Sequence, residues 1–260
     1  MSEEWMVACQ PAEASSIRSH GAERLSIVHR NDEDNHGLSV VEHSPLFSGI
    51  LAADDMIVSA AARLKEFQRG EILYAEGGPV QHISLLTSGF AKITQHGPGG
   101  TEVILRVCVP GDVLGAVGLF SDGRHYTSAQ AFRLCRALVW DAPAFAALVK
   151  RFPVLQHNMV RSLGDDLREL QERFREVATE RVASRVARQL LRLLEKMGRP
   201  ANGMVEVSLS REELARMTGT TLFTVSRLLS VWEADGIVKP RREAVAICDV
   251  QALRAIFAPR

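Results

Sequence analysis

The sequence lacks any apolar run of the roughly 18–20 residues that a membrane helix needs. The apolar stretch 140–149 is interrupted by Asp141 and Pro143. The first residues include Glu3 and Glu4, and they have neither the basic start nor the apolar core of a secretory signal. These absences argue against a membrane partner and predict a cytoplasmic protein.

Cysteines and enzyme motifs are equally sparse. The four cysteines stand far apart without a C-x-x-C pair, at Cys9, Cys108, Cys135 and Cys248. A zinc ribbon and a disulfide framework are therefore not expected, and isolated buried thiols are the ordinary interpretation. The sequence also has no nucleophile elbow, no H-E-x-x-H helix and no glycine-rich phosphate loop between a strand and a helix. It predicts neither a metal site nor an enzyme.

The chain has no net charge, because 31 Lys and Arg side chains balance 31 Asp and Glu side chains over 260 residues. The balance is uneven along the chain. Residues 1–178 carry 17 basic and 22 acidic side chains, whereas residues 179–260 carry 14 basic and 9 acidic ones. The sequence therefore predicts two units with different tasks, and the charge of the C-terminal one suits a nucleic-acid partner.

Composition and periodicity divide the chain into four regions, which are 1–43, 44–152, 153–178 and 179–260. The first is polar and aperiodic, so we expect a flexible extension with room for one short helix over 22–29. The second contains short apolar runs separated by glycine turns, which is typical of an antiparallel sandwich or barrel. Its strand candidates are Ile83–Thr87, Phe90–Gln95, Glu102–Val109 and Ser128–Trp140.

Asp141 and Pro143 mark the start of a short helix that ends near Arg151, with the Asp141 side chain as its cap. Pro153 then opens a long helix that has one apolar stripe on a charged surface. The stripe consists of Leu155, Met159, Leu163, Leu167, Leu170, Phe174 and Val177, of which the last five follow a heptad. Two interpretations remain open: the stripe packs on its own β domain, or it forms a self-complementary seam between two chains. The pattern favours the dimer.

The most specific pattern lies near the C-terminus. Ser210 and Glu213 form a capping box at the start of one helix, and Gly219 makes a tight turn after it. A second helix begins near Thr220 or Thr221. Its inward apolar positions are Leu222, Val225, Leu228, Leu229 and Trp232. A helix, a glycine turn and a second helix together predict a helix-turn-helix.

The outer face of the second helix combines small and polar side chains with two long ones. The face consists of Phe223, Ser226, Arg227 and Ser230, with Thr224 beside them. Such a face suits the DNA major groove, where the Arg227 fork matches the O6 and N7 acceptors of guanine. Phe223 has two interpretations: it contacts a thymine methyl group, or it folds back onto its own domain.

Further helices and a hairpin flank this motif. One helix is expected over 180–197 and a last short one over 249–257. Between Gly236 and the last helix, two short β segments enclose a turn with three basic residues, Lys239, Arg241 and Arg242. We expect this hairpin to be a wing whose charges lie beside the phosphate backbone.

The order of β domain, long helix, helix-turn-helix and wing resembles the CRP/FNR superfamily of bacterial transcription regulators, over about residues 44–257. The similarity is strongest in Thr224–Leu229, which follows Leu209–Leu214. Glycines of the β domain also match the family, at Gly70, Gly89, Gly111 and Gly115. The resemblance implies an α+β fold, namely an N-terminal β-roll of the cyclic-nucleotide-binding jelly-roll type, a dimerisation helix and a C-terminal winged helix-turn-helix domain.

The resemblance also implies a homodimer on a palindromic operator, with one helix per half-site about one DNA turn apart, and RNA polymerase as a partner. The DNA contacts it implies are Ser210, Arg211, Thr220, Thr221, Phe223, Thr224, Ser226, Arg227, Lys239, Arg241 and Arg242. Members of the family contact bases through three positions of the second helix, which hold, in chain order, a Glu, a Ser or Gly, and an Arg. Phe223 stands here in place of the Glu, so the cytosine contact that a Glu would make is lost.

The effector pocket implied by the resemblance departs further from the family pattern. Cyclic-nucleotide binders pair a Glu after a glycine with an Arg, and these positions hold Ala116 and Tyr126 here. A cyclic phosphate would lose its charge partner in a partly buried site, so we do not expect cyclic AMP to bind tightly. The residues expected to form the pocket are Gly115, Ala116, Val117, Tyr126, Thr127, Leu167, Leu170 and Gln171.

The identity of the effector stays open at this point. Cys9 stands alone where the oxygen-sensing branch has a cysteine cluster, which argues against an iron–sulfur cofactor. The second helix is similar to those of nitrogen-oxide regulators, which raises haem as a cofactor. Its candidate axial ligands are His43, His82, His96, His125 and His157. The alternative function is a ligand-binding module that acts through protein partners rather than DNA, and the sequence does not decide between activation and repression.

Overall fold

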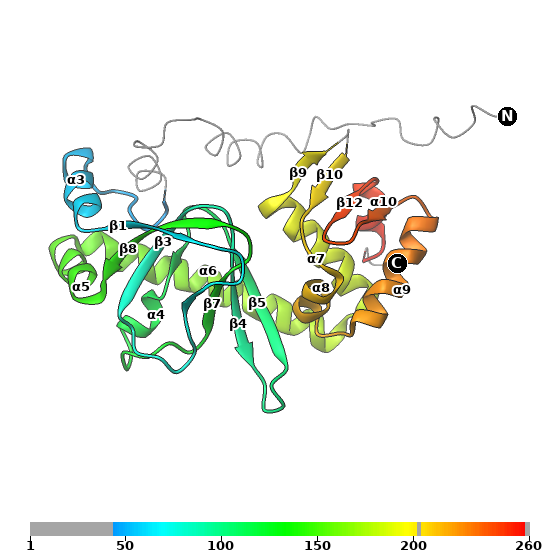
Figure 1. The fold of residues 1–260 in the computed structure, drawn as a ribbon, viewed down its shortest axis with the longest axis horizontal. Helices are drawn as coiled ribbons and strands as arrows, with labels where there is room; N and C mark the ends of the chain where they lie inside the picture. The colour runs from blue at the N-terminus through cyan, green and yellow to red at the C-terminus, as the bar shows by residue number, and fades with distance from the viewer. Residues whose placement is uncertain (1–43, 202–203, 258–260) are drawn as a thin grey trace. The chain divides into compact units, whose positions relative to one another are not determined.

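The structure is a computed structural model that describes residues 44–201 and 204–257. The chain forms two compact units, which divide after residue 175 (Figure 1). The N-terminal extension, with its expected helix over 22–29, lies outside the described residues. Within the described part, no helix is both long and apolar enough to cross a membrane.

The first unit is built on two antiparallel sheets of four strands each, which confirms the predicted β-roll. One sheet has the order β1-β8-β3-β6, with strands Arg63–Phe67, Cys135–Asp141, His82–Ser88 and Val113–Leu114. The other has the order β2-β7-β4-β5, with strands Ile72–Tyr74, Ser128–Ala131, Ala91–His96 and Glu102–Cys108. Three of these strands, β1, β2 and β6, have no counterpart in the prediction.

The segment predicted as one long strand over 128–140 is two strands that belong to different sheets. The prediction was wrong because the chain turns between β7 and β8, where the Phe132 N–H donates to the Phe90 carbonyl oxygen at 2.8 Å. Gly89 permits this turn: its φ is 73°, and a Cβ there would lie 2.1 Å from the Leu134 carbonyl oxygen. Any other residue would push the two segments apart.

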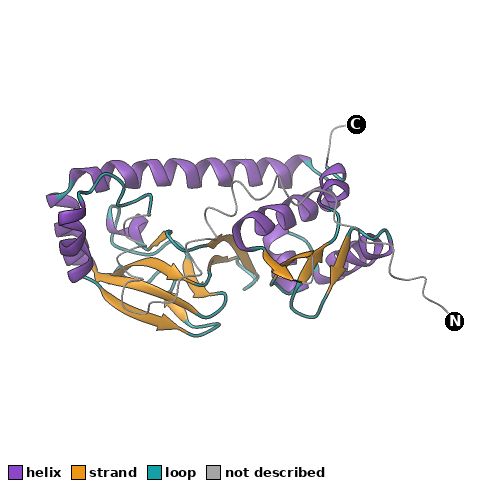
Figure 2. Ribbon diagram, turned by 90° about the horizontal axis from the view of Figure 1, so that it is seen from above, coloured by secondary structure: helices purple, strands orange, loops and turns teal. Residues whose placement is uncertain are grey.

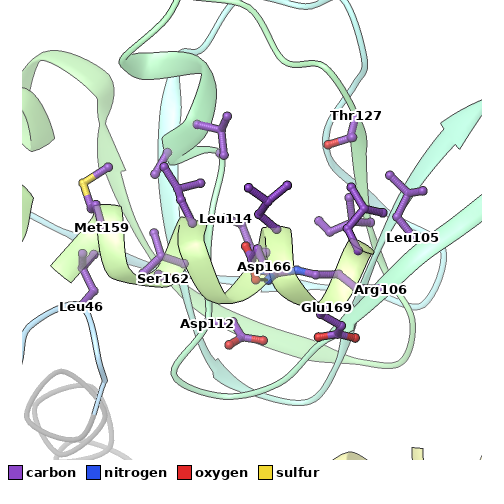
Figure 3. A pocket seen from close by; sticks show the side chains of 18 of the residues that line it. Leu46, Leu105, Arg106, Asp112, Leu114, Thr127, Met159, Ser162, Asp166 and Glu169 are labelled. Carbon is purple, nitrogen blue, oxygen red and sulfur yellow. Dashed lines mark hydrogen bonds and ion pairs between the residues drawn. The ribbon is translucent and has the colours of Figure 1, made fainter. Parts of the chain in front are cut away.

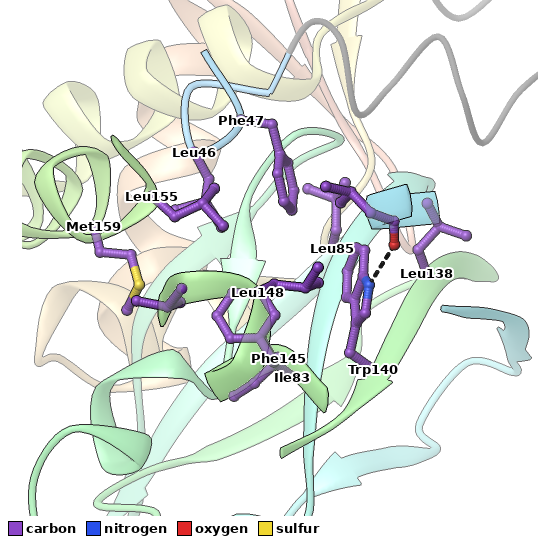
Figure 4. Packing of buried hydrophobic residues seen from close by; sticks show 12 residues of the cluster. Leu46, Phe47, Ile83, Leu85, Leu138, Trp140, Phe145, Leu148, Leu155 and Met159 are labelled. Atoms are coloured by element: carbon purple, nitrogen blue, oxygen red, sulfur yellow. Dashed lines mark hydrogen bonds between the residues drawn. The ribbon is translucent and has the colours of Figure 1, made fainter. Parts of the chain in front are cut away.

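Trp140 lies in the larger core cluster of this unit (Figure 4). It is fully buried, and its indole N–H donates to the Val58 carbonyl oxygen at 2.8 Å. This bond joins strand β8 to helix α3 (Ala52–Ala60). Phe145 of helix α5 (Ala142–Arg151) meets the Trp140 ring edge-on, with centroids 5.9 Å apart. The core therefore fixes two helices to one sheet.

Asp141 precedes α5 as predicted, but the Asp141 side chain does not cap the helix. Its carboxylate pairs instead with Arg63 at 3.3 Å and with His82 at 3.1 Å. These partners come from β1 and β3, which flank β8 in the sheet. The predicted cap was wrong because cross-strand contacts, an ion pair with Arg63 and a close approach to the His82 ring, involve the carboxylate instead, and a local pattern does not show them.

Helix α6 (Pro153–Thr179) is one continuous helix (Figure 2). Its first turns belong to the Trp140 core: Leu155 is fully buried and Met159 is 7 % exposed. The Asn158 amide anchors the same turns by donating to the Leu46 carbonyl oxygen at 2.9 Å. Assigning Leu155 and Met159 to a seam between chains was therefore wrong, because their own unit already covers them.

The second unit is a helix-turn-helix with a small antiparallel sheet, as predicted. Its helices are α7 (Val182–Met197), α8 (Arg211–Thr218), α9 (Leu222–Ala234) and α10 (Val250–Ala255). Its sheet has the order β11-β12-β10-β9, with strands Val238–Pro240, Val245–Ile247, Met204–Val207 and Arg199–Ala201. The β9–β10 hairpin was not predicted, because strands this short show no alternating pattern.

Candidate functional site

The first unit contains a cavity of about 370 Å³, lined by the second sheet, the start of helix α4 (Ala116–Leu119) and one face of α6 (Figure 3). Most of its wall is apolar. Six of the predicted pocket residues line it: Gly115, Ala116, Val117, Thr127, Leu167 and Leu170. The other two do not, since Tyr126 is half exposed at the surface and Gln171 is exposed on α6.

Gly115 forms the corner of this cavity. Its φ is 87°, and a Cβ there would lie 3.1 Å from the His82 carbonyl oxygen and 3.2 Å from the His125 ring. A glycine is therefore required for α4 to start this close to the neighbouring strand.

A charged pair inside this wall was missed by the sequence analysis. The Arg106 guanidinium extends from β5 to the Asp166 carboxylate on α6 (Figure 3). The two side chains are 22 % and 38 % exposed. A signal was present, since Arg106 interrupts an apolar strand and Asp166 lies beside the leucine stripe, but 60 positions separate them. Nothing in the local pattern indicates that they meet.

Three further titratable groups in this region, Tyr74, His125 and Cys108, are neutral. Tyr74 lines the wall and stacks on His125, with ring centroids 3.9 Å apart. Burial raises the pKa of Tyr74 to about 12 and lowers the pKa of His125, so both rings are uncharged at pH 7. Burial also raises the pKa of Cys108 to about 12, which keeps this thiol protonated.

None of the candidate histidines is among the described residues that line the wall, so the cavity does not hold the axial ligand that the sequence analysis considered for haem. Of the five candidate histidines, His43 lies outside the described residues. In the described chain, no three His, Cys, Asp or Glu side chains come together in a way that could hold a metal ion.

Helix α8 begins with the predicted capping box. The Glu213 N–H donates to Ser210 Oγ at 3.1 Å, and the Ser210 N–H donates to the Glu213 carboxylate at 2.6 Å. Gly219 ends the helix with a φ of 60°, which confirms the tight turn. Thr221 then caps α9 by accepting the Thr224 N–H at 3.2 Å. Both helix starts are therefore determined by local side chains.

The inner face of α9 buries Val225, Leu229 and Trp232, as predicted. Leu222, however, is 50 % exposed, so its inward assignment was wrong: it is the first residue of the helix, next to the turn. On the outer face Phe223 is 77 % exposed, which excludes the interpretation that it folds back onto its own unit. Arg227 is exposed one turn further along.

The other expected DNA contacts surround this face. Thr221 is exposed, and the half-buried members are Ser210, Arg211, Thr220, Thr224 and Ser226. On the β11–β12 wing, Lys239 and Arg242 are exposed, whereas Arg241 pairs with the Glu206 carboxylate at 2.8 Å. The wing therefore presents less positive charge than its three basic residues indicate.

Beyond its buried first turns, α6 exposes an apolar stripe. We call the exposed stripe the set whose members are 41 % to 75 % exposed, namely Val160, Leu163, Leu167, Leu170, Phe174 and Val177. They recur at spacings of 3, 4, 3, 4 and 3 residues, a complete heptad pattern. Val160 was missed because the sequence analysis followed Leu155 and Met159 instead. Leu163, Leu167 and Leu170 belong both to the exposed stripe and to the cavity wall.

The last turn of α6, from Glu176 onward, belongs to the second unit and contains a buried carboxylate. Glu176 is 4 % exposed and accepts a bond from the Arg192 guanidinium of α7 at 2.9 Å. Arg188 of the same helix lies 3.4 Å from Glu176 and 3.2 Å from Glu180. The last turn of α6 is therefore fixed to α7 by ion pairs.

Comparison with known proteins first defines the class. A model of the cyclic nucleotide-binding domain matches residues 64–152, and a model of the Crp-like helix-turn-helix domain matches residues 184–256. A chain with these two domains is a DNA-binding transcription regulator with a sensor domain of the cyclic-nucleotide-binding type.

Individual proteins are similar to this chain over most of its length. The chain is 26% identical to the CRP-like cAMP-activated global transcriptional regulator of Mycobacterium tuberculosis over 216 residues, which cover 82% of this chain and 96% of the relative. It is 27% identical to the cyclic AMP receptor protein of Thermus thermophilus over 213 residues, with the same two coverages. The structure of the c-di-GMP responsive global regulator CLP of Xanthomonas campestris has the same fold, with a TM-score of 0.69, 19% identity, and coverage of 76% of this chain and 100% of that one. The chain belongs to the CRP/FNR family of transcription regulators.

Proposed function

We propose that the chain acts as a homodimer on a palindromic operator and that an effector in the cavity controls its affinity for DNA. One observation carries this proposal: Leu163, Leu167 and Leu170 line the cavity and also belong to the exposed stripe. A molecule in the cavity touches the side chains that a partner helix would cover. Effector binding therefore biases how two α6 helices pack.

The occupant of the exposed stripe is a second copy of this chain. Six large apolar side chains at heptad spacing on one helix face are the pattern of a two-helix seam, and a two-fold axis makes such a face self-complementary. Burying these side chains is favourable by roughly 1.5–3 kcal/mol for each one that becomes fully covered. Packing on the chain's own β domain, the other interpretation of the stripe, accounts only for Leu155 and Met159.

The buried Glu176 carries the signal onward. Because Arg188 and Arg192 hold it against α7, a rotation of the paired α6 helices moves the helix that supports the helix-turn-helix. Removing either arginine would leave part of the charge of the buried Glu176 uncompensated, which is energetically costly.

For DNA we propose that α9 enters the major groove, with Arg227 on guanine and Phe223 on a thymine methyl group. The thymine methyl is the apolar feature of the major groove, and the exposed Phe223 ring is an apolar partner for it. Phosphate contacts come from the flanks of the motif and from the wing: Ser210, Arg211, Thr220, Thr221, Lys239, Arg241 and Arg242. The side chains of Thr224 and Ser226 are small, so α9 can lie deep in the major groove. RNA polymerase is the protein partner that the family implies.

The effector we propose is not cyclic AMP. Two of the relatives carry cyclic AMP in their names. This chain has Ala116 in the cavity wall where the cyclic-nucleotide binders have a Glu, and Tyr126 outside the wall where they have an Arg. A titration calorimetry experiment with cyclic AMP tests this, and we expect no heat of binding at micromolar ligand.

The test of the DNA proposal is selection of sites from a random DNA library with the full chain, followed by fluorescence anisotropy. We expect a palindrome with half-site centres about 10–10.5 base pairs apart, two chains per site, and affinity that falls steeply with salt. A single half-site is the control and should bind far more weakly. Selected sites without symmetry, or one chain per site, would contradict the proposal.

A further inference from the structure

The start of helix α9 exposes two adjacent large apolar side chains. Phe223 is 77 % exposed and Leu222 is 50 % exposed. They occupy the first two positions of the helix, directly after the Thr221 cap. A helix that enters the major groove presents its N-terminal residues to the base edges. Neither side chain has a hydrogen-bonding group, so the feature of a base that suits this pair is an apolar one.

Hydroxyl groups that neighbour this apolar pair in the sequence already have partners within α9. The hydroxyl oxygens of Thr221 and Thr224 are bonded to each other at 3.0 Å, and Thr221 Oγ1 also accepts the Thr224 N–H. Further along, the Ser230 hydroxyl donates to the Ser226 carbonyl oxygen at 3.0 Å. Polar contacts of these hydroxyl groups with a base would compete with bonds that stabilise α9. The apolar pair has no such bonds to lose.

The apolar feature of a pyrimidine in the major groove is a methyl group on C5. Thymine always carries this methyl group, whereas cytosine carries it only after methylation to 5-methylcytosine. The two bases differ at position 4, where thymine has a carbonyl oxygen and cytosine has an amino group. A phenyl ring forms a hydrogen bond with neither group. A contact with such a ring therefore selects for the methyl group and not for the base that carries it.

We propose that α9 recognises C5 methylation of the operator: Phe223, with Leu222 beside it, binds 5-methylcytosine as well as thymine and disfavours unmethylated cytosine. This inference rests on the proposed function, in which α9 enters the major groove with Arg227 on guanine. Phe223 and Arg227 are four residues apart on α9, which places their Cβ atoms about 5–6 Å apart on one face, so they reach neighbouring base pairs. Methylation of a cytosine near that guanine then raises the affinity of the chain for its operator.

The experiment is fluorescence anisotropy of the full chain with the palindrome obtained by site selection. Each pyrimidine of one half-site is tested in four forms, namely thymine, uracil, cytosine and 5-methylcytosine. Two comparisons isolate the methyl group, because thymine and uracil both pair with adenine, and cytosine and 5-methylcytosine both pair with guanine. At one position or more, we expect the methyl group to strengthen binding roughly fourfold in both comparisons, which is the effect of burying one methyl group.

Phe223→Ala should abolish the preference for the methylated forms, and Leu222→Ala should reduce it. The matched control is Val231→Ala, which truncates a side chain that is 53 % exposed near the other end of α9 and should leave the preference unchanged. Circular dichroism shows whether each variant keeps the wild-type fold. The same preference for the methyl group in the wild type and in a folded Phe223→Ala variant overturns the proposal.

Phe223→Glu supplies a test that loss of folding cannot imitate, because it predicts a gain. A Glu carboxylate accepts a hydrogen bond from the amino group of cytosine. At the contacted position, the variant should therefore bind the unmethylated cytosine form about fivefold or more tightly than the thymine form. A variant that keeps the wild-type order of the four forms overturns the proposal.

The same titrations separate this inference from the proposed function. If the chain binds the palindrome as a dimer but binds cytosine and 5-methylcytosine equally at every position, the recognition of methylation fails and the proposed function stands. If the chain selects no DNA site, both fail.

Discussion

The DNA-binding surface and the cavity are built from the chain in opposite ways. The groove face and the two helix caps lie within 210–230, and the bonds that form the caps join residues three positions apart. The wing also uses more distant partners, because β12 pairs with β10 and Arg241 pairs with Glu206. The cavity draws its wall from Pro45 to Arg173, and its ion pair joins residues 60 positions apart. The groove face is therefore determined mainly by residues near it in the sequence. The shape of the cavity depends instead on how the whole β domain packs.

The two regions also differ in what they retain of the family pattern. The groove face has Arg227 where the resemblance implies a guanine-reading Arg, and Phe223 where it implies a Glu. The cavity wall has Ala116 where the resemblance implies a Glu, and Tyr126, where it implies an Arg, is not among the lining residues. The groove face therefore stays nearer to the family pattern than the cavity does.

The largest expected effect comes from the core that holds the cavity together. Trp140→Ala should lower the free energy of unfolding of the first unit by about 3–5 kcal/mol, because it leaves a void between β8, α3 and α5. Urea unfolding followed by circular dichroism measures this. Leu64→Ala, at a side chain that is 58 % exposed, is the control and should cost no more than about 0.5 kcal/mol. Similar losses in both variants would contradict the described core.

The next effect concerns the exposed stripe. Phe174→Glu puts a charge into the proposed seam and should raise the dimer dissociation constant roughly thirtyfold or more, which corresponds to about 2 kcal/mol. Sedimentation equilibrium measures the constant. Glu172→Lys changes a charge on the opposite side of α6 and should leave it nearly unchanged. If the Phe174→Glu variant has the dimer dissociation constant of the wild type, the exposed stripe is not the dimer seam.

On the DNA surface, Arg227→Ala should weaken binding to the selected site by about 1–3 kcal/mol and relax the preference for guanine at one base pair. Lys239→Ala should weaken binding to all DNA sequences alike. It should also reduce the slope of log affinity against log salt concentration by about one. Anisotropy titrations on specific and scrambled DNA at several salt concentrations distinguish the two. Loss of affinity without loss of base preference in the Arg227 variant would refute its reading role.

The smallest effect isolates one methyl group. Replacing the contacted thymine by uracil removes only the methyl, and the wild-type chain should lose about 0.8 kcal/mol, or roughly fourfold in affinity. Phe223→Ala should bind thymine and uracil sites equally, so the two changes form a double-mutant cycle. The same uracil penalty in both proteins would show that Phe223 does not read the methyl.

Sequence analysis succeeded where structure is determined by neighbours along the chain. The capping box of Ser210 and Glu213, the turn at Gly219 and the start of the second helix near Thr220 or Thr221 were all identifiable from residue types and spacing. The long helix and an antiparallel β domain were also predicted, because periodicity and glycine turns indicate them, and the resemblance to the family implied that this domain is a β-roll.

It failed where a residue's partner is distant in sequence. Leu155 and Met159 continue the periodicity of the stripe, but the Trp140 core covers them. Asp141 matches a helix cap, but strands on both sides of it supply better partners. The Arg106–Asp166 pair was missed for the same reason. Periodicity identifies an apolar face, and only the fold determines what covers it.

The central claim is that the cavity and DNA affinity are coupled through leucines shared with the seam. The most direct test fills the cavity: Val117→Trp, in the wall on α4, is compared with Val103→Trp, on β5 but outside the wall. DNA affinity is measured by anisotropy for both variants, after circular dichroism shows that each keeps the wild-type fold. The account predicts that Val117→Trp changes DNA affinity by about fivefold or more while Val103→Trp does not. Wild-type DNA affinity in both folded variants would contradict it.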